Sequence, residues 1–228
     1  HIPLFKGVYY LAKDISILDL ERVHYDKFID LRARMEPRQI LPWGKAKFKD
    51  YISKDRSDMF DRACGVSTKG KFFEIAEPGS AVTSSFLHKC PKNFLFRHPK
   101  IVIAPISTTR ARAIPPMYVK PLCDLLIDQL NAYTVLIGQT QSPKENKLIK
   151  KIKEPKIINL IDKLTLPEFI VACRLADLII SPDSAALHIG GCLRIKTLGL
   201  FGNIDPKTRV SYYPTVQTIY PKGEYPCI

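Results

Sequence analysis

The chain has 228 residues, of which 46% are hydrophobic, 10% aromatic and 25% charged. This globular composition supports a substantial core and excludes a disordered, collagen-like or coiled-coil protein, and the longest apolar runs are too short to span a bilayer. Basic side chains number 35 and acidic ones 22, a net charge of +13 shared between residues 1–100 (+7) and residues 101–228 (+6). A surplus spread in this way suits a protein that binds nucleic acid, an anionic membrane surface or a phosphate-bearing substrate, and equally a solvated surface rich in lysine.

The first hundred residues show few regular patterns. We expect a strand at Tyr25–Leu31, a helix at Ser57–Cys64 and a second strand at Lys71–Ile75. The segment Pro78–Pro99 is rich in Pro, Ser and Lys, which is typical of a linker. The sequence therefore predicts one domain in residues 1–97 and another in residues 98–228.

From residue 100 onward, short apolar runs alternate with helical patterns. We expect strands at Ile101–Pro105, Tyr133–Ile137, Ile157–Leu160, Leu178–Ile180 and Thr197–Phe201, the last of these being the final strand. The helices between them are expected at Pro115–Leu130, Lys144–Lys153, Leu166–Leu175 and Ser184–Cys192. This alternation predicts a doubly wound parallel sheet, whose ligands bind at the carboxyl edge of the strands.

Three loops are expected at that edge. Ser107–Arg112 offers hydroxyl groups, loop amides and two guanidinium groups, which suit a phosphate cradle as well as an ordinary polar loop. In the second loop, Ser181–Ser184, either Asp183 or Ser184 is placed to cap the following helix. The third, Gly202–Pro206, is by itself only a turn.

Cysteine spacing and missing motifs narrow the possible chemistry. The six cysteines form no C-x-x-C pair, so zinc-finger spacing is absent, and Cys123 and Cys173 are expected to be reduced thiols packed in the core. No signal-peptide pattern begins the sequence, which favours a cytoplasmic protein. The P-loop, G-x-G-x-x-G, G-x-S-x-G and H-E-x-x-H motifs are also missing, which argues against a nucleotidase, dehydrogenase, hydrolase or zinc protease.

Several motifs occur in the order seen in a known family. The run from Asp183 to His188, D-S-A-A-L-H, resembles the D-[ST]-G-x-x-H motif of family-nine glycosyltransferases, the bacterial heptosyltransferases that build the lipopolysaccharide inner core. Leu200–Pro206 is similar to their [YF]-G-x-T-x-P segment, and Ser107–Pro115 to their T-T-R-x-x-K-x-W-P loop. A weaker likeness joins Tyr25–Leu31 to their Y-D-x-x-I-D-L strand.

The resemblance implies a GT-B-like α/β architecture of two Rossmann-like doubly wound domains, with a nearly complete C-terminal domain and a reduced N-terminal one. It implies that a nucleotide-diphosphate sugar, with ADP as the nucleotide, is held mainly by the C-terminal domain. The diphosphate would be bound by the loop after the first strand of that domain, the nucleobase by one leucine, and the sugar and phosphates by the D-[ST]-G-x-x-H segment. The residues concerned are, in order, Thr108, Thr109, Arg110 and Arg112, then Leu164, then Asp183, Ser184, Ala185 and Ala186, with His188 supporting that segment.

The expected activity is transfer of a heptose-like sugar to a glycolipid or glycan acceptor in lipopolysaccharide biosynthesis, in the cytoplasm against the anionic inner membrane, without a metal ion or other cofactor. No general base is assigned, because the family's glycine-aspartate loop after its first strand has no match here. The only acidic loop near the start is Tyr9–Asp14, and the motif glycine is replaced by Ala185. The alternative is therefore a non-catalytic relative that binds nucleotide-sugar or serves in assembly. A nucleic-acid binder is a third reading, based on the net charge and the aromatic and basic residues of Trp43–Tyr51.

Overall fold

The computed structural model describes residues 75–140, 147–202 and 204–221. Within them, six parallel strands form one sheet in the order β3-β2-β1-β4-β5-β6. The strands are β1 (Lys100–Ile103), β2 (Tyr133–Leu136), β3 (Ile157–Asn159), β4 (Leu178–Pro182), β5 (Thr197–Leu200) and β6 (Val216–Ile219). The expected elements at Tyr25–Leu31 and Ser57–Cys64, and nearly all of the one at Lys71–Ile75, lie outside the described residues, as do Tyr9–Asp14 and Trp43–Tyr51.

Five of the six strands were predicted, and the sixth was not. In the centre of the sheet, Val102 of β1 lies opposite Val135 of β2 on one side and Ile179 of β4 on the other, so these apolar runs are buried on both faces. The expectation that Thr197–Phe201 is the final strand is wrong, because β6 pairs with β5 and forms the edge of the sheet. Most of β6 is exposed, so it lacks the apolar run that marks a buried strand.

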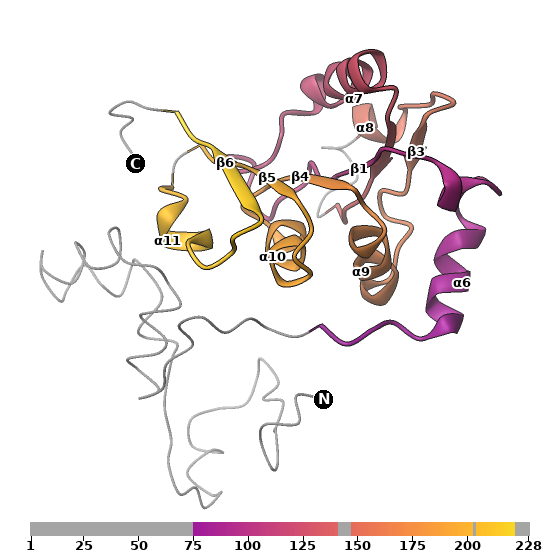
Figure 1. The fold of residues 1–228 in the computed structure, drawn as a ribbon. Helices are drawn as coiled ribbons and strands as arrows, with labels where there is room; N and C mark the ends of the chain where they lie inside the picture. Colours follow the sequence, from indigo (N-terminus) through magenta and orange to yellow (C-terminus); the bar gives the residue numbers. More distant parts are fainter. Residues whose placement is uncertain (1–74, 141–146, 203, 222–228) are drawn as a thin grey trace, which may run out of the picture.

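Helices cover both faces of the sheet: α7 and α8 lie on one face and α9 and α10 on the other (Figure 1). The side chains of β1 alternate between two cores, since Ile101 and Ile103 pack with α7 and α8, whereas Val102 packs with α9 and α10. The helices are α6 (Ser80–His88), α7 (Pro116–Leu130), α8 (Lys147–Lys150), α9 (Leu166–Arg174), α10 (Ala185–Cys192) and α11 (Lys207–Val210), with a 3-10 turn, η2, at Phe94–Phe96. None of the helices in the described residues is long and apolar enough to cross a membrane.

The segment expected to be a linker, Pro78–Pro99, is instead part of the packed structure. It forms α6 and η2, and the buried rings of Phe86 and Phe94 meet edge to face with centroids 5.9 Å apart. Figure 1 shows α6 beside α9. The Glu168 carboxylate on α9 accepts hydrogen bonds from the Ser85 hydroxyl (2.7 Å) and the Lys89 ammonium (2.6 Å). The proline, serine and lysine content of this segment gave no sign of the two buried phenylalanines through which residues 80–97 pack with the sheet that follows them. The division into two domains at residue 97 remains a prediction.

Two smaller expectations have different outcomes. The helix expected at Lys144–Lys153 ends at Lys150, because the chain turns after Lys150 to reach β3. Residues 144–146 lie outside the described part. Cys123 and Cys173 are fully buried free thiols, as predicted. Burial raises the pKa of Cys123 to about 11 and that of Cys173 to about 12, so both are protonated and unreactive.

Candidate functional site

The strand order reverses between β1 and β4. β2 and β3 lie on one side of β1, whereas β5 and β6 lie beyond β4. At such a switch point the chain leaves the two central strands toward opposite faces of the sheet, which opens a crevice where α/β proteins bind ligands. The loop after β1 carries Thr108, Thr109 and Arg112, and the residue directly after β4 is Asp183. The topology therefore brings two of the predicted segments together at the position favoured for a ligand.

The loop after β1 is held in one shape by its own backbone. The Ile114 N–H donates to the Pro105 carbonyl across the base of the loop at 2.9 Å, and the Arg112 N–H donates to the Thr109 carbonyl at 3.1 Å. Gly202, in the loop after β5, lies beside this loop, since a Cβ added there would be 3.9 Å from the Ala111 carbonyl oxygen. The loops after β1 and β5 thus adjoin each other at the same edge of the sheet.

Arg112 links the loop after β1 to the end of β4. Its Nη1 donates to the Asp183 carbonyl at 3.2 Å and to the Asp183 carboxylate at 3.3 Å, while its Nε donates to the Thr109 hydroxyl at 3.0 Å and its Nη2 to the Thr108 hydroxyl. Four of the five guanidinium N–H bonds are therefore directed at fixed acceptors. The side chain is 28% exposed, so this ordered cation still faces solvent at the edge of the sheet.

These contacts also orient the two threonine hydroxyl groups. Each oxygen accepts from Arg112, and a hydroxyl that accepts in this way keeps its hydrogen for another partner. Within the described residues, no hydrogen bond donated by either hydroxyl is found, and both Thr108 and Thr109 are exposed. The loop therefore presents two O–H donors beside a guanidinium, which suits phosphate oxygens.

Asp183 lies among basic side chains from three elements. Its carboxylate is 9% exposed and lies 3.3 Å from Arg112 Nη1, 3.6 Å from Arg209 Nε on α11 and 3.5 Å from His188 Nε2 on α10. Burial raises the pKa of Asp183, but the contact with His188 and the charges of Arg209 and Arg112 outweigh it, so the pKa lies below its ordinary value. Asp183 is therefore an ionised counter-charge at neutral pH, and two arginines around one aspartate leave the site positive.

The N-terminus of α10 has no side-chain cap. Ser184 occupies the N-cap position, but its hydroxyl pairs with the Ser181 hydroxyl at 2.8 Å and makes no capping bond. The Asp183 carboxylate faces the basic groups, so the expectation that one of these residues caps the helix is wrong. Ala185 is exposed in the first turn of α10, whereas Ala186 is buried in the core. At Ala186, therefore, only the backbone and not the side chain is placed for a ligand. The first amides of α10 face the edge of the sheet.

His188 lies on α10, part-exposed and close to Asp183. Its ring packs edge to face on Tyr213, with centroids 5.9 Å apart, while Nε2 faces Asp183. Tyr213 in turn covers Gly191, where an added Cβ would lie 2.4 Å from the tyrosine ring. The structure thus places His188 against the aspartate of its own motif, and its support role remains a prediction.

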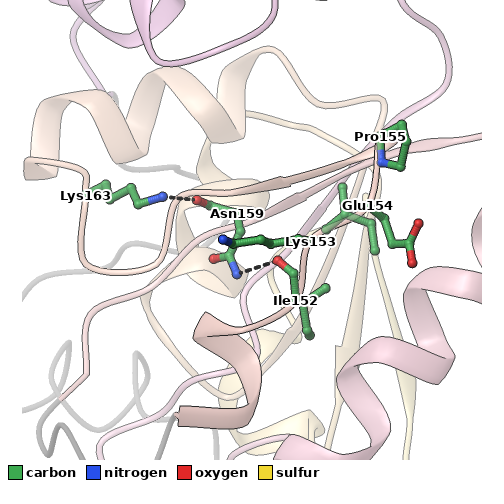
Figure 2. Close-up of a pocket in the computed structure, with 7 residues that line it drawn as sticks. Ile152, Lys153, Glu154, Pro155, Asn159 and Lys163 are labelled. Carbon is green, nitrogen blue, oxygen red and sulfur yellow. Dashed lines mark hydrogen bonds between the residues drawn. The ribbon is translucent and has the colours of Figure 1, made fainter.

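The remaining predicted residues lie less centrally. Arg110 is exposed in the same loop as Arg112. Leu164 follows β3, which β2 and β1 separate from β4, and it is half-buried against the core beneath α6 and α9. Its neighbour Lys163 lines a pocket at the edge strand β3, where the Lys163 ammonium donates to the Asn159 carbonyl at 2.8 Å and the Asn159 amide donates to the Ile152 carbonyl at 3.4 Å (Figure 2). The structure therefore joins Thr108, Thr109, Arg112, Asp183 and His188, and leaves Leu164 apart from them.

Arg209 is the one member of the cluster that sequence reasoning missed. It lies on α11, a short helix whose start is fixed by Asp205, since the Lys207 N–H donates to the Asp205 carboxylate at 2.9 Å and the Thr208 hydroxyl to the Asp205 carbonyl at 2.8 Å. The Asp-Pro turn was recognisable in the sequence. No periodicity or motif, however, indicated that a basic residue four positions after Asp205 faces Asp183. Among the described residues, no group of three or more His, Cys, Asp or Glu side chains is placed to hold a metal ion.

Comparison with known proteins settles the family. The model of glycosyltransferase family 9 (heptosyltransferase) matches residues 40–227. The chain belongs to this family. The family-nine glycosyltransferase of Veillonella parvula is similar in structure, with a TM-score of 0.58 and 18% identity over 74% of this chain and 49% of that one. The Escherichia coli ADP-heptose lipopolysaccharide heptosyltransferase II has a TM-score of 0.53 and 19% identity, over 64% of this chain and 45% of that one.

No curated protein matches the sequence. The resemblance to family-nine glycosyltransferases is confirmed, and so is the α/β fold class, since the six-stranded parallel sheet and its flanking helices match these relatives. This chain spans just under half the length of either one. Membership of the family supports sugar transfer in general, while the donor, the acceptor and the roles of individual residues are matters for proposal.

Proposed function

We propose that this family-nine glycosyltransferase binds the diphosphate of a nucleotide-sugar at the edge of the sheet between β1 and β4. The observation that carries the proposal is the Arg112 cluster at the switch point, where one ordered guanidinium orients two threonine hydroxyls outward. A diphosphate offers oxygens that accept from both kinds of donor. The uncapped amides at the start of α10 add further donors on the neighbouring loop.

Chemically, such a site assists departure of the nucleoside diphosphate. In sugar transfer, the acceptor hydroxyl oxygen forms a bond to the anomeric carbon while the bond from that carbon to the diphosphate oxygen breaks. The hydroxyl gives its proton to a general base, a role to which no residue of this chain is assigned. Negative charge grows on the departing oxygen, and fixed positive groups and helix amides stabilise it in the transition state. Arg112 and the start of α10 supply those groups without a metal ion.

For the donor, we propose an ADP-sugar of the heptose type. Support comes from the name of the E. coli relative, an ADP-heptose lipopolysaccharide heptosyltransferase. The net charge of +13 supports an acceptor carried on an anionic glycolipid at a membrane surface, such as one in lipopolysaccharide biosynthesis. The resemblance to the family supports Leu164 as the residue that packs on the nucleobase, and the segment from Asp183 to Ala186 as the one that contacts the sugar and phosphates.

Isothermal titration calorimetry with ADP, ADP-heptose and UDP-sugars tests this function. Arg112→Met should weaken ADP binding by about tenfold or more, because hydrogen bonds to charged groups each contribute about 1.5–3 kcal/mol. Arg174→Met is the matched control. It removes the same charge from the C-terminal end of α9, at the opposite edge of the sheet, where Arg174 pairs with Glu77. Absence of binding to every nucleotide, or equal loss in both variants, would refute the proposal.

A second candidate function is nucleotide-sugar binding without turnover. Ala185 favours it, because its methyl group is exposed in the first turn of α10, where the family motif has glycine. A side chain there stands beside the amides that a ligand would approach. Binding of ADP-heptose without sugar transfer by the wild type, together with transfer by Ala185→Gly, would favour this candidate over the enzyme.

A further inference from the structure

Arg209 is a buried cation close to the proposed diphosphate site. Its side chain is only 8% exposed. Nη1 donates to the Thr208 carbonyl at 3.4 Å, while Nε is buried without a hydrogen-bond partner among the described residues. Nε faces the Asp183 carboxylate, with Oδ2 at 3.6 Å. A guanidinium removed from water in this way needs a neighbouring negative charge, so Arg209 and Asp183 stabilise each other's position.

The same carboxylate oxygen also faces the exposed part of the site. Asp183 Oδ2 lies 3.3 Å from Arg112 Nη1, so one oxygen is shared by a buried guanidinium from α11 and a part-exposed one from the loop after β1. Arg112 in turn orients the hydroxyls of Thr108 and Thr109. A continuous chain of contacts thus runs from α11 to the groups that face solvent.

We propose that Arg209 is a positioning residue of the diphosphate site, which fixes the Asp183 carboxylate so that Asp183 fixes Arg112. The proposal rests on the proposed function for the role of the site, but the hold of Arg209 on Asp183 is measurable without any ligand. Without Arg209, the carboxylate keeps Arg112 and His188 as its only partners among the described residues, and it gains freedom to turn toward either. Arg112 and both hydroxyls then lose their single geometry, and a phosphate must order them again at a cost in affinity.

A purely structural role for Arg209 is the competing explanation, and coupling separates the two. If Arg209 acts through Arg112, its removal should weaken ADP binding in the wild type but not in a protein that already lacks Arg112. If Arg209 contacts the phosphates itself, the two losses should multiply. If Arg209 only contributes to packing, Arg209→Met should lower the stability of the protein and leave ADP affinity unchanged.

The experiment measures ADP affinity by calorimetry on the full chain. Arg209→Met should weaken binding by about tenfold, and Arg209→Lys, which keeps the charge, by less than about threefold. Arg174→Met, the remote charge control, should bind as the wild type does, and Arg209→Met in an Arg112→Met background should cause no further loss. Equal affinity of Arg209→Met and wild type, or the same loss in both backgrounds, would overturn the proposal. If Arg209→Met does not fold, Arg209→Gln takes its place.

A second readout needs no ligand. With ¹³C-labelled aspartate carboxyls, the Asp183 resonance should titrate at higher pH in Arg209→Met than in the wild type, because Arg112 and His188 alone must then offset its burial. An unchanged titration would overturn the proposed hold of Arg209 on Asp183. If the wild type binds no ADP but the titration shifts, the proposed function fails while the link between Arg209 and Asp183 stands. If the wild type binds ADP, but Arg209→Met changes neither the ADP affinity nor the Asp183 titration, the proposed function stands and the positioning role of Arg209 fails.

Discussion

Replacing Phe86 by alanine tests whether α6 is an integral part of the folded sheet domain. The Phe86 side chain is 0% exposed, meets Phe94 edge to face, and belongs to the core that α9 and α10 share with the central strands. Truncation removes a complete buried ring and leaves a cavity among rigid neighbours. Such Phe-to-Ala changes cost about 3–5 kcal/mol of unfolding free energy. Because Phe86 sits where α6 meets this core, we expect a loss in that range.

Urea unfolding followed by circular dichroism measures this loss, and η2 provides the control. Phe96 is a phenylalanine only ten positions away, but its side chain is 85% exposed. Phe96→Ala should therefore change the unfolding free energy by less than about 0.5 kcal/mol. If Phe86→Ala were as mild as Phe96→Ala, α6 would not be part of the cooperative unit. That result would instead support the prediction that residues 78–99 form a linker.

Three further predictions concern other parts of the fold. Hydrogen bonds from Lys89 and from its own capping box lower the pKa of Glu168 to about 2, so its stabilising contribution is complete above its ordinary value of 4.5 and is lost as the pH falls toward 2. Glu168→Gln should therefore reduce the unfolding free energy by about 1–2 kcal/mol at pH 7 and by clearly less at pH 3, as measured by urea unfolding. Gly191→Ala should lower stability by about 1–3 kcal/mol, because the added methyl meets the Tyr213 ring at 2.4 Å, and an unchanged melting temperature would contradict that packing. Cys173, with its pKa raised to about 12, should resist iodoacetamide in the native protein and react only on unfolding, as peptide mass spectrometry would show.

The sheet was largely predictable because its central strands are local signals. Ile101–Pro105 and Leu178–Ile180 are short apolar runs, and burial on both faces of a parallel sheet requires that composition. β6 escaped prediction for the opposite reason, since an edge strand buries little and needs no apolar run. α6 escaped because two phenylalanines supply its anchorage within a segment that otherwise reads as a linker.

In the candidate site, the sequence predicted which loops contribute residues, but not the contacts between those residues. The positions of Arg112 and Asp183 follow from strand ends, which a local pattern locates. That Arg112 donates to Asp183 depends on β1 and β4 being neighbours, and that Arg209 faces the same carboxylate depends on how α11 packs. Both are long-range consequences of the fold. Local preference also misled at the helix start, where Ser184 is a favourable cap residue by type but pairs with Ser181 instead.

The presence of an acidic residue at the centre of the proposed phosphate site has a physical explanation in this geometry. By itself, Asp183 repels a diphosphate and cancels one of the two nearby arginine charges. Its carboxylate, however, is turned toward Arg112, Arg209 and His188, and its low pKa keeps it charged so that those groups stay in place. Two long, flexible arginines would otherwise lose rotamer entropy when a ligand bound, at about 0.5–1.5 kcal/mol for each side chain. The aspartate thus weakens the attraction for a diphosphate, but it orders the two arginine side chains before a ligand binds. The net positive charge that remains is directed toward the edge of the sheet.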